Sequence, residues 1–220
     1  MQFLYHDEAG LATLTLTGEA YKYLFKVRRF ELGKTLGFRN LKDDTVYQYQ
    51  IESIRKKEAT LFMIDSFLKV TSPQKMLHIL WCIIEPKVIE KTLPMLNQLG
   101  VSKISFLYCE RSQKSFKIDL ERMKKILINS SQQCGRSDLM VLEVLDSLDV
   151  AMGQYPDFSL VDFGGELIVG DARAIMIGCE GGFSEAERLR LSKHKKIGLD
   201  TSLILKSETV AVTFASKLLI

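Results

Sequence analysis

Two glycine-rich turns near the C-terminal end limit the fold most strongly, because each follows a short apolar run and leads into a helix signal. The first is Ile177–Ser184 and the second runs from Gly198 to Thr209. Ser184 with Glu187 fits the S-x-x-E capping box, which predicts a helix directly after the first turn. In the same way we expect Ser207 to cap the last helix. Turns of this kind indicate an α/β domain, and their glycines leave backbone N–H and C=O groups open to a ligand.

A purely structural role for these turns and a shared nucleotide-like pocket are about equally supported, since any α/β domain contains strand–glycine–helix turns. No G-x-G-x-x-G motif opens a βαβ unit, and no G-x-x-x-x-G-K-[ST] motif is present. A dinucleotide site of the Rossmann type and a P-loop are therefore not expected.

The composition is that of an ordinary globular protein, since 46% of the 220 residues are apolar and 26% are charged. No apolar run approaches the roughly 18 residues of a membrane span, and the first residues lack the layout of a signal peptide. The cysteines are scattered without a C-x-x-C pair, and there are three histidines. We therefore expect a reduced, cytoplasmic protein with no membrane span and no metal site.

The net charge of +3 conceals an uneven distribution along the chain. Residues 73–136 carry 11 Lys and Arg against 5 Asp and Glu, whereas residues 137–220 carry 8 against 13. A basic segment of this kind can follow a phosphate backbone. Solvent-exposed helix faces whose opposite charges balance in the folded protein explain the same charge distribution equally well.

Residues 1–71 predict a small, mainly β unit, because they contain alternating segments rich in β-branched and aromatic side chains. A short helix is expected over residues 18–27. The pattern changes near residues 71–73, so we expect a second domain over residues 72–220. The strands expected in the first unit are residues 13–16, 45–51 and 59–64.

From residue 72 onward strand and helix signals alternate, which implies a mostly parallel sheet with helices on both faces. Pro86 suits the first turn of a helix. Pro94 within that helix is expected to kink or interrupt it. The expected strands are residues 76–84, 103–107, 158–161 and 174–177, and a second helix is expected from Leu120 to Cys134, before Gly135.

Residues 76–220 resemble the SPOUT (trefoil-knotted) methyltransferases, and more narrowly the bacterial family that methylates N3 of a uridine in 16S ribosomal RNA. The family's I-G-P-E-G-G-F-S-x-x-E stands here as residues 177–187, with Cys179 in place of the proline. Its later I-L-R-x-E-T segment stands as residues 204–209, with Lys206 in place of the arginine. Shorter family-like stretches are Leu99–Val101, Glu110–Ser112 and Gln133–Arg136.

This resemblance implies an α/β fold with a trefoil-knotted domain and a mainly parallel sheet, preceded by a PUA-like β-barrel that binds RNA. It also implies a homodimer that binds S-adenosylmethionine in a deep knot made by three loops, the first near residues 162–165. The expected partner is 16S rRNA within the 30S subunit, in ribosome biogenesis. The predicted cofactor-binding residues are Phe163, Gly164, Ile177, Gly178, Glu180, Gly181, Gly182, Leu199, Ser202, Leu203 and Leu205.

Methyl transfer to N3 of uracil requires removal of the imide proton and stabilisation of the negative charge left on the ring. Lys206 or Arg136 can supply the stabilising charge, by the logic of an oxyanion hole. Glu208 is a candidate catalytic carboxylate or a plain first-turn helix residue, and the general base is a carboxylate, a water or hydroxide. The RNA-binding candidates are Arg28, Arg29 and Arg39 in the first unit and Arg111, Lys114, Lys117 and Arg136 in the second domain.

Three other hypotheses stay open from the sequence. The chain could be a SPOUT methyltransferase of another rRNA or tRNA nucleotide. It could instead be a non-catalytic RNA-binding protein of ribosome assembly, since lysine at position 206 lacks the planar fork of arginine. An unrelated α/β protein that binds a small ligand is the third alternative, and the basic segment argues against it.

Overall fold

The computed structural model describes residues 2–167 and 172–220, which form two compact units. The first unit comprises residues 1–72 with 131–139, and the second comprises residues 73–130 with 140–220. Residues 131–139 lie within the range expected for the second domain and pack with the first unit.

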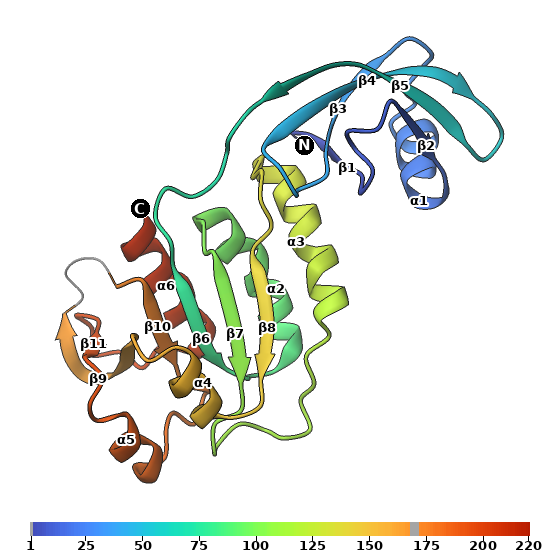
Figure 1. The fold of residues 1–220 in the computed structure, drawn as a ribbon. Helices are drawn as coiled ribbons and strands as arrows, with labels where there is room; N and C mark the ends of the chain where they lie inside the picture. Colours follow the sequence, from blue (N-terminus) through green and yellow to red (C-terminus); the bar gives the residue numbers. More distant parts are fainter. Residues whose placement is uncertain (1, 168–171) are drawn as a thin grey trace. The chain divides into compact units, whose positions relative to one another are not determined.

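The first unit is built on a five-stranded sheet with the order β1-β3-β4-β5-β2 (Figure 1). Strand β1 pairs with β3 in parallel, and all other pairs are antiparallel. The end strands β1 and β2 are not paired with each other, so the expected barrel is present in an open form. Its elements are β1 (Leu4–Tyr5), β2 (Thr13–Leu16), α1 (Gly18–Tyr21), the π-helical turn η1 (Lys22–Val27), β3 (Thr35–Arg39), β4 (Thr45–Ile54) and β5 (Ala59–Leu68).

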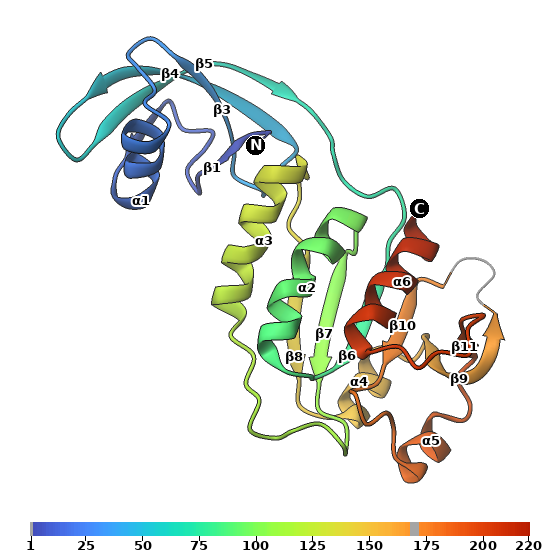
Figure 2. The ribbon, with the colours of Figure 1, turned by 180° about the vertical axis from the view of Figure 1, so that it is seen from behind.

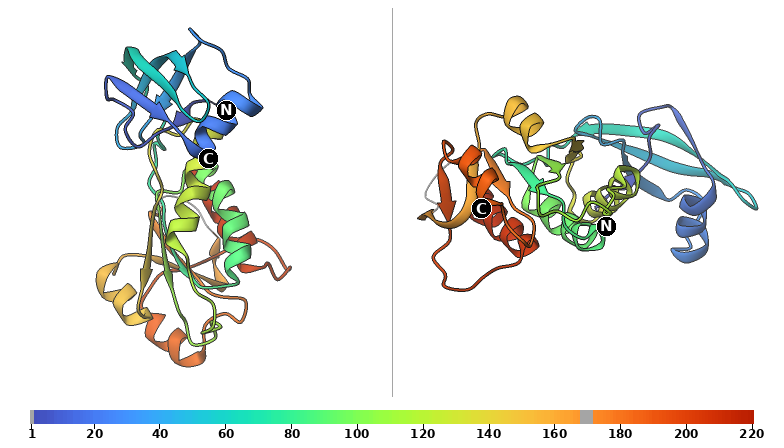
Figure 3. Two further views of the ribbon diagram at one scale, coloured as in Figure 1. Left: turned by 90° about the vertical axis from the view of Figure 1, so that its right-hand side faces the viewer. Right: turned by 90° about the horizontal axis from the view of Figure 1, so that it is seen from below.

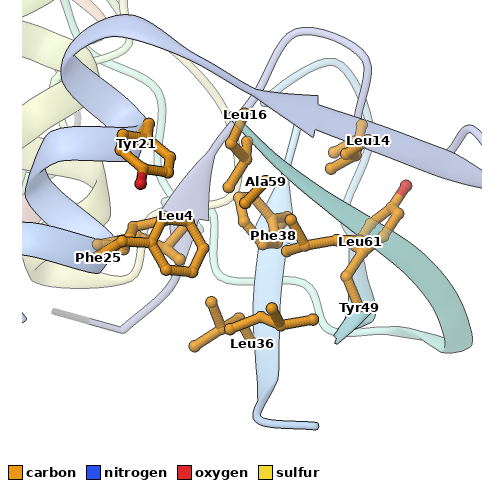
Figure 4. Close-up of a cluster of buried hydrophobic side chains, with 13 residues drawn as sticks. Leu4, Leu14, Leu16, Tyr21, Phe25, Leu36, Phe38, Tyr49, Ala59 and Leu61 are labelled. Atoms are coloured by element: carbon orange, nitrogen blue, oxygen red, sulfur yellow. The ribbon is translucent and has the colours of Figure 1, made fainter. Parts of the chain in front are cut away.

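The core of this unit follows from alternation along the strands. Leu14 and Leu16 are buried while Thr15 between them is exposed, as expected where successive side chains point to opposite faces. Figure 4 shows these leucines with Phe38 and Tyr49 in one cluster. The Tyr49 hydroxyl donates to the carbonyl oxygen of Leu11 at 2.6 Å, which satisfies the polar tip of an otherwise apolar ring.

The second unit is a six-stranded, all-parallel sheet with the order β11-β9-β10-β6-β7-β8, which confirms the expected α/β class. Helices α2, α3 and α6 lie on one face and α4 lies on the other (Figures 2 and 3). The elements are β6 (His78–Cys82), α2 (Pro86–Leu99), β7 (Lys103–Leu107), α3 (Leu120–Cys134), β8 (Val141–Leu145), α4 (Leu148–Gln154), β9 (Ser159–Leu167), β10 (Ala174–Ile177), α5 (Glu185–Leu191), β11 (Lys196–Gly198) and α6 (Ser207–Leu219).

Helix α2 continues through Pro94, so the expected interruption does not occur, and a kink at this residue stays a prediction. The helix begins with Pro86 in its first turn, where the missing N–H costs nothing, and ends at Gly100 with a left-handed φ of 96°. Pro94 leaves one carbonyl of the preceding turn without its helical donor. Burial of Leu93 and Leu96 in the core holds the helix together across this point.

Among the described residues no helix is long and apolar enough to cross a membrane. The same part of the chain contains no cluster of His, Cys, Asp or Glu side chains arranged to hold a metal ion. The threading of a trefoil knot depends on the full chain path, including residues 168–171 outside the described ranges, and stays a prediction.

Candidate functional site at the glycine loops

The strand order of the second unit reverses at β6. From β6 the chain proceeds outward to β7 and β8, and it then returns on the opposite side, where β10 pairs with β6. In open parallel sheets, ligands bind at the carboxyl ends of the strands where the order reverses in this way. The first glycine turn follows β10 and therefore lies at this position.

Strand β9 corrects the expected position of the first loop. It extends to Leu167, beyond the expected end at Val161, and so includes residues 162–165. Its pairing with β11 jumps from Leu160 to Glu166, which leaves the intervening residues as a bulge within the strand. A Cβ atom on Gly165 would lie only 2.4 Å from the carbonyl carbon of Ile197. Glycine is therefore required where the bulge meets β11.

The first glycine turn is held in a tight conformation. Gly182 has a φ of 64°, and its N–H donates to the carbonyl oxygen of Cys179 at 2.9 Å. A Cβ atom on Gly178 would lie 3.3 Å from the Cα of Gly182. The Arg111 guanidinium donates to the carbonyl oxygen of Gly181 at 2.7 Å, which anchors the turn to the segment after β7.

The predicted capping box of α5 is confirmed and has a further role. The Ser184 hydroxyl accepts from the N–H of Glu187 at 3.2 Å, and the Glu187 carboxylate accepts from the N–H of Ser184 at 3.0 Å. The same carboxylate also accepts from the N–H of Glu110 at 2.7 Å. Glu187 thus fixes the start of α5 against the segment that carries Arg111. The S-x-x-E pattern predicts the cap, but not this long-range bond.

The predicted cap of the last helix by Ser207 is wrong. The N-cap of α6 is Lys206, and the buried Ser207 hydroxyl makes no capping bond. It donates to the carbonyl oxygen of Gly178 at 2.6 Å and accepts from the indole nitrogen of Trp81 at 2.9 Å. These long-range partners satisfy the hydroxyl and join the first glycine turn directly to the start of α6.

Exposed apolar side chains occur on the segments brought together in this way. Phe163 in the bulge is 69% exposed, and Leu203 and Ile204 before α6 are 70% and 82% exposed. Lys206 is exposed, and in the described part of the chain its amine has no hydrogen-bond or ion-pair partner. These segments therefore offer apolar contact area and one available cation beside backbone polar groups.

Charged side chains that the sequence analysis did not identify hold the bulge in place. The largely buried Asp162 carboxylate pairs with Arg188 of α5 at 3.1 Å and lies 3.9 Å from the Lys196 amine. It also accepts from the N–H of Phe163 at 2.9 Å. An acidic residue before two glycines is no specific signal, and only the folded structure shows this pairing.

The predicted RNA-binding arginines occupy different environments. Arg28 and Arg29 are exposed at the end of η1, and the Arg28 guanidinium lies over the Tyr23 ring. Arg39 is buried and donates to the carbonyl oxygens of Asp44 and Lys69, so it serves the first unit's core and is not open to RNA. Arg111 is exposed on the second unit.

Arg136 is buried in the first unit, where its guanidinium forms a two-pronged ion pair with Asp138 at 2.9 and 2.8 Å. Such a pair already occupies part of the planar fork of the side chain. A catalytic or RNA-binding role for Arg136 stays a prediction.

A second polar network lies toward the amino ends of the central strands. The Glu143 carboxylate accepts from Ser105 at 2.5 Å and from Tyr155 at 2.8 Å, and it pairs with Lys103 at 3.0 Å. Burial opposes the charge of Glu143, but these bonds outweigh it and lower its pKa. Burial, and then the positive charge of Lys103, lower the pKa of His78 to about 4. His78 is thus neutral at neutral pH, with its Nε2 2.6 Å from the Ser105 hydroxyl.

The fold and the glycine loops together define the class of protein. The RNA methyltransferase domain family matches residues 71–219, and the RNA methyltransferase PUA domain family matches residues 16–64. The chain therefore belongs to the RNA methyltransferase family with an N-terminal PUA domain.

The chain is similar over nearly its whole length to the ribosomal RNA small subunit methyltransferase E of Helicobacter pylori. It is 43% identical to this enzyme in one strain and 42% identical in another, over 98% of each chain. A methyltransferase structure from Legionella pneumophila with bound S-adenosylmethionine is 25% identical, with a TM-score of 0.83 over 99% of this chain and 96% of that chain. A small subunit methyltransferase E structure from Neisseria gonorrhoeae gives a TM-score of 0.83 over 99% and 96% of the two chains at 18% identity, which shows the shared fold.

Proposed function

We propose that the chain transfers a methyl group from S-adenosylmethionine to N3 of a uridine in 16S rRNA of the small ribosomal subunit. The observation that carries this proposal is the convergence of the β9 bulge, the first glycine turn and the start of α6 at the carboxyl edge of the parallel sheet. Similarity to small subunit methyltransferases over 98% of the chain supports the substrate class.

The residues at this edge fit S-adenosylmethionine. Gly178 and Gly182 let the first glycine turn fold tightly at the carboxyl end of β10, where backbone N–H and C=O groups suit recognition of an adenine edge. Phe163, Leu203 and Ile204 supply exposed apolar area. S-adenosylmethionine, when bound, supplies an electrophilic methyl group on a sulfonium centre. We propose that Gly164, Ile177, Glu180, Gly181, Leu199, Ser202 and Leu205 complete its binding site.

In the proposed reaction Lys206 acts on the uracil ring. Lys206 is the N-cap residue of α6, and its amine, without a partner among the described residues, stabilises the negative charge that remains on O2 and O4 after the N3 proton leaves. Glu180 is exposed on the first glycine turn and Glu208 is partly exposed in the first turn of α6. Either carboxylate can accept the imide proton directly or through water.

For RNA binding we propose Arg28 and Arg29 on the first unit and Arg111 on the second. All three are exposed, and phosphate contacts by such side chains make binding weaken as salt increases. The Arg111 guanidinium has five N–H donors, and its bond to the Gly181 carbonyl uses one at Nη1. Other donors of Arg111 are therefore available to a phosphate. We place the protein in the cytoplasm, where the assembled 30S subunit is its proposed substrate.

We also propose a homodimer. Val210, Val212 and Leu219 of α6 are only partly buried, and Leu203 and Ile204 before the helix are exposed. A second copy that covers these side chains would remove apolar area from water. Light scattering after gel filtration measures the mass directly, and a mass near the single-chain 25.0 kDa would contradict this proposal.

The substrate assignment is tested with labelled S-adenosylmethionine. The protein is incubated separately with undermethylated 30S subunits, naked 16S rRNA and tRNA, and the labelled nucleoside is identified by mass spectrometry. We expect 3-methyluridine in the small subunit RNA. Label only in tRNA would assign a different substrate, and no label in any RNA would favour a non-catalytic RNA-binding protein.

A further inference from the structure

Three thiols meet at the carboxyl edge of the three adjacent strands β10, β6 and β7. Cys82 is the last residue of β6, Cys109 follows β7 and Cys179 follows β10. The Sγ atoms of Cys109 and Cys179 lie 3.3 Å apart although the residues are 70 positions apart in the sequence. All three side chains are buried and none forms a disulfide.

The surroundings of the pair make its two thiols unequal. The Cys179 thiol, the Cys82 thiol and the Ser112 hydroxyl all hydrogen-bond to its sulfur, which lowers the pKa of Cys109 despite burial. The pKa of Cys179 is raised, first by its bond to Cys109 and then by burial. Cys109 is therefore the thiol of the pair that gives up its proton more readily, and attack by a thiolate is the step that forms a disulfide.

The approach needed for a bond is short. A disulfide has an S–S distance of about 2.05 Å, so the two sulfurs must move together by about 1.2 Å. Cys179 is 6% exposed and Cys109 is 1% exposed. This burial admits a small oxidant such as hydrogen peroxide more readily than a bulky disulfide.

Movement of Cys179 is coupled to the proposed cofactor loop. Its carbonyl oxygen accepts from the N–H of Gly182 at 2.9 Å, and the carbonyl of the preceding Gly178 accepts from Ser207 at 2.6 Å. On the other side, the Cys109 carbonyl accepts from the N–H of Ser112 at 3.1 Å and from Lys114 at 3.3 Å. Both ends are held, so a disulfide must displace the glycine turn or the segment after β7.

We propose that Cys109 and Cys179 form a reversible disulfide that switches off binding of S-adenosylmethionine at the first glycine turn. The Cys109 thiolate attacks one oxygen of hydrogen peroxide, the O–O bond breaks, and a sulfenic acid and, after protonation, one water result. The Cys179 sulfur then displaces the sulfenic hydroxyl, which leaves with the Cys179 proton as a second water. Two thiols and one peroxide thus give one disulfide and two waters, with two electrons passing from sulfur to oxygen. A small dithiol restores both thiols by exchange through a mixed disulfide.

The inference rests on the proposed function. The following experiment distinguishes failure of the disulfide switch from failure of the proposed function. The full chain is treated with hydrogen peroxide, free thiols are blocked, and the linked peptides are identified by mass spectrometry. Affinity for S-adenosylmethionine is measured by calorimetry in the reduced, the oxidised and the dithiothreitol-treated protein. We expect a peptide pair that joins Cys109 to Cys179, at least a tenfold loss of affinity on oxidation, and recovery on reduction.

Matched variants identify the sulfur responsible. Cys109→Ser keeps a hydrogen-bonding group beside Ser112 but cannot form the bond, so peroxide should leave its affinity unchanged. Cys134→Ser removes a thiol outside the cluster and should respond to peroxide as the unmodified chain does. The peptide map of the unmodified chain needs no variant and stands if Cys109→Ser fails to fold.

The absence of a Cys109–Cys179 peptide, or a link from Cys82 instead, would overturn the inference. So would a linked protein that binds S-adenosylmethionine as tightly as the reduced one. If the reduced protein binds no S-adenosylmethionine before any oxidant is added, the proposed function itself fails, and the switch fails with it.

Discussion

Single side chains at the carboxyl edge of the second unit perform separable tasks. Ser207 and Glu187 are buried and satisfy backbone groups of the loops, so their role is to fix the loop geometry. Lys206 is exposed and its amine is unpartnered in the described part of the chain, so its charge remains available to a substrate. Buried groups are therefore expected to affect stability, and Lys206 is expected to affect catalysis.

Replacement of Lys206 by Ala should lower kcat by roughly a hundredfold, the usual effect of removing one group that stabilises an anionic transition state. Affinity for S-adenosylmethionine should change little, because the proposed role is toward the uracil ring. Steady-state methyl transfer and calorimetry measure the two quantities. Lys91→Ala removes another exposed lysine, on α2, and serves as the control. Equal losses of turnover and cofactor affinity would assign Lys206 to the cofactor pocket instead.

His78 should make stability depend on pH. Its pKa falls from the ordinary 6.5 to about 4 in the fold, so the unfolded chain binds more protons between these values. The contribution of neutral His78 is complete above pH 6.5 and is lost as the pH falls toward 4. Because the ring is partly in contact with solvent, we expect a loss of about 1–2 kcal/mol.

Urea unfolding between pH 7 and pH 4 measures this dependence. The variant His78→Gln can still bond to Ser105 but does not titrate, so its stability should decline less steeply over the same range. His194, whose pKa is lowered first by burial, accounts for part of the remaining slope. Parallel declines for the variant and the unmodified chain would refute the assignment to His78.

At the scale of elements, the sequence predicted correctly those strand and helix bounds that depend on residues close together in the chain. The strands Lys103–Leu107 and Ala174–Ile177 and the helix Leu120–Cys134 have the expected bounds, because periodicity and a following glycine or polar turn define them. The errors at Ser207 and in β9 share one cause. Ser207 bonds to Trp81 and Gly178 from distant segments, and β9 is extended by pairing with β11.

The same limit applies to the candidate site. The glycine turn and its capping box were visible in the sequence because they are contiguous. The Asp162–Arg188 ion pair and the Arg111–Gly181 bond join residues that meet only after the sheet forms. No local pattern in the sequence shows which charged residue will bond to which distant group.

A pair of glycine variants tests the contact between β9 and β11. In Gly165→Ala the new methyl group would lie 2.4 Å from the Ile197 carbonyl carbon, so the strands must separate, at a cost of about 1–3 kcal/mol. Gly153→Ala adds a methyl group to α4 with no heavy atom within 4 Å and should stabilise by about 0.5–1 kcal/mol. Urea denaturation measures both, and a Gly165→Ala variant as stable as the unmodified chain would rule out a tight approach.

At the scale of the whole molecule, the chain combines a PUA domain with a parallel α/β domain of the RNA methyltransferase family. The two carry different parts of the proposed function. The exposed arginines of the first unit suit RNA phosphates, and the loop cluster of the second suits the methyl donor. The proposed homodimer and the proposed knot would further restrict the movement of these loops, in addition to the contacts described within one chain.

The most direct test of the account is hydrogen–deuterium exchange of the full chain with and without S-adenosylmethionine, followed by mass spectrometry. If backbone groups of the converging segments bind the methyl donor, protection should appear in residues 162–167, 177–184 and 199–206. The peptides from residues 1–72 should exchange at the same rate in both samples. Exchange unchanged in all three segments at saturating S-adenosylmethionine, or protection confined to other parts of the chain, would contradict the central claim.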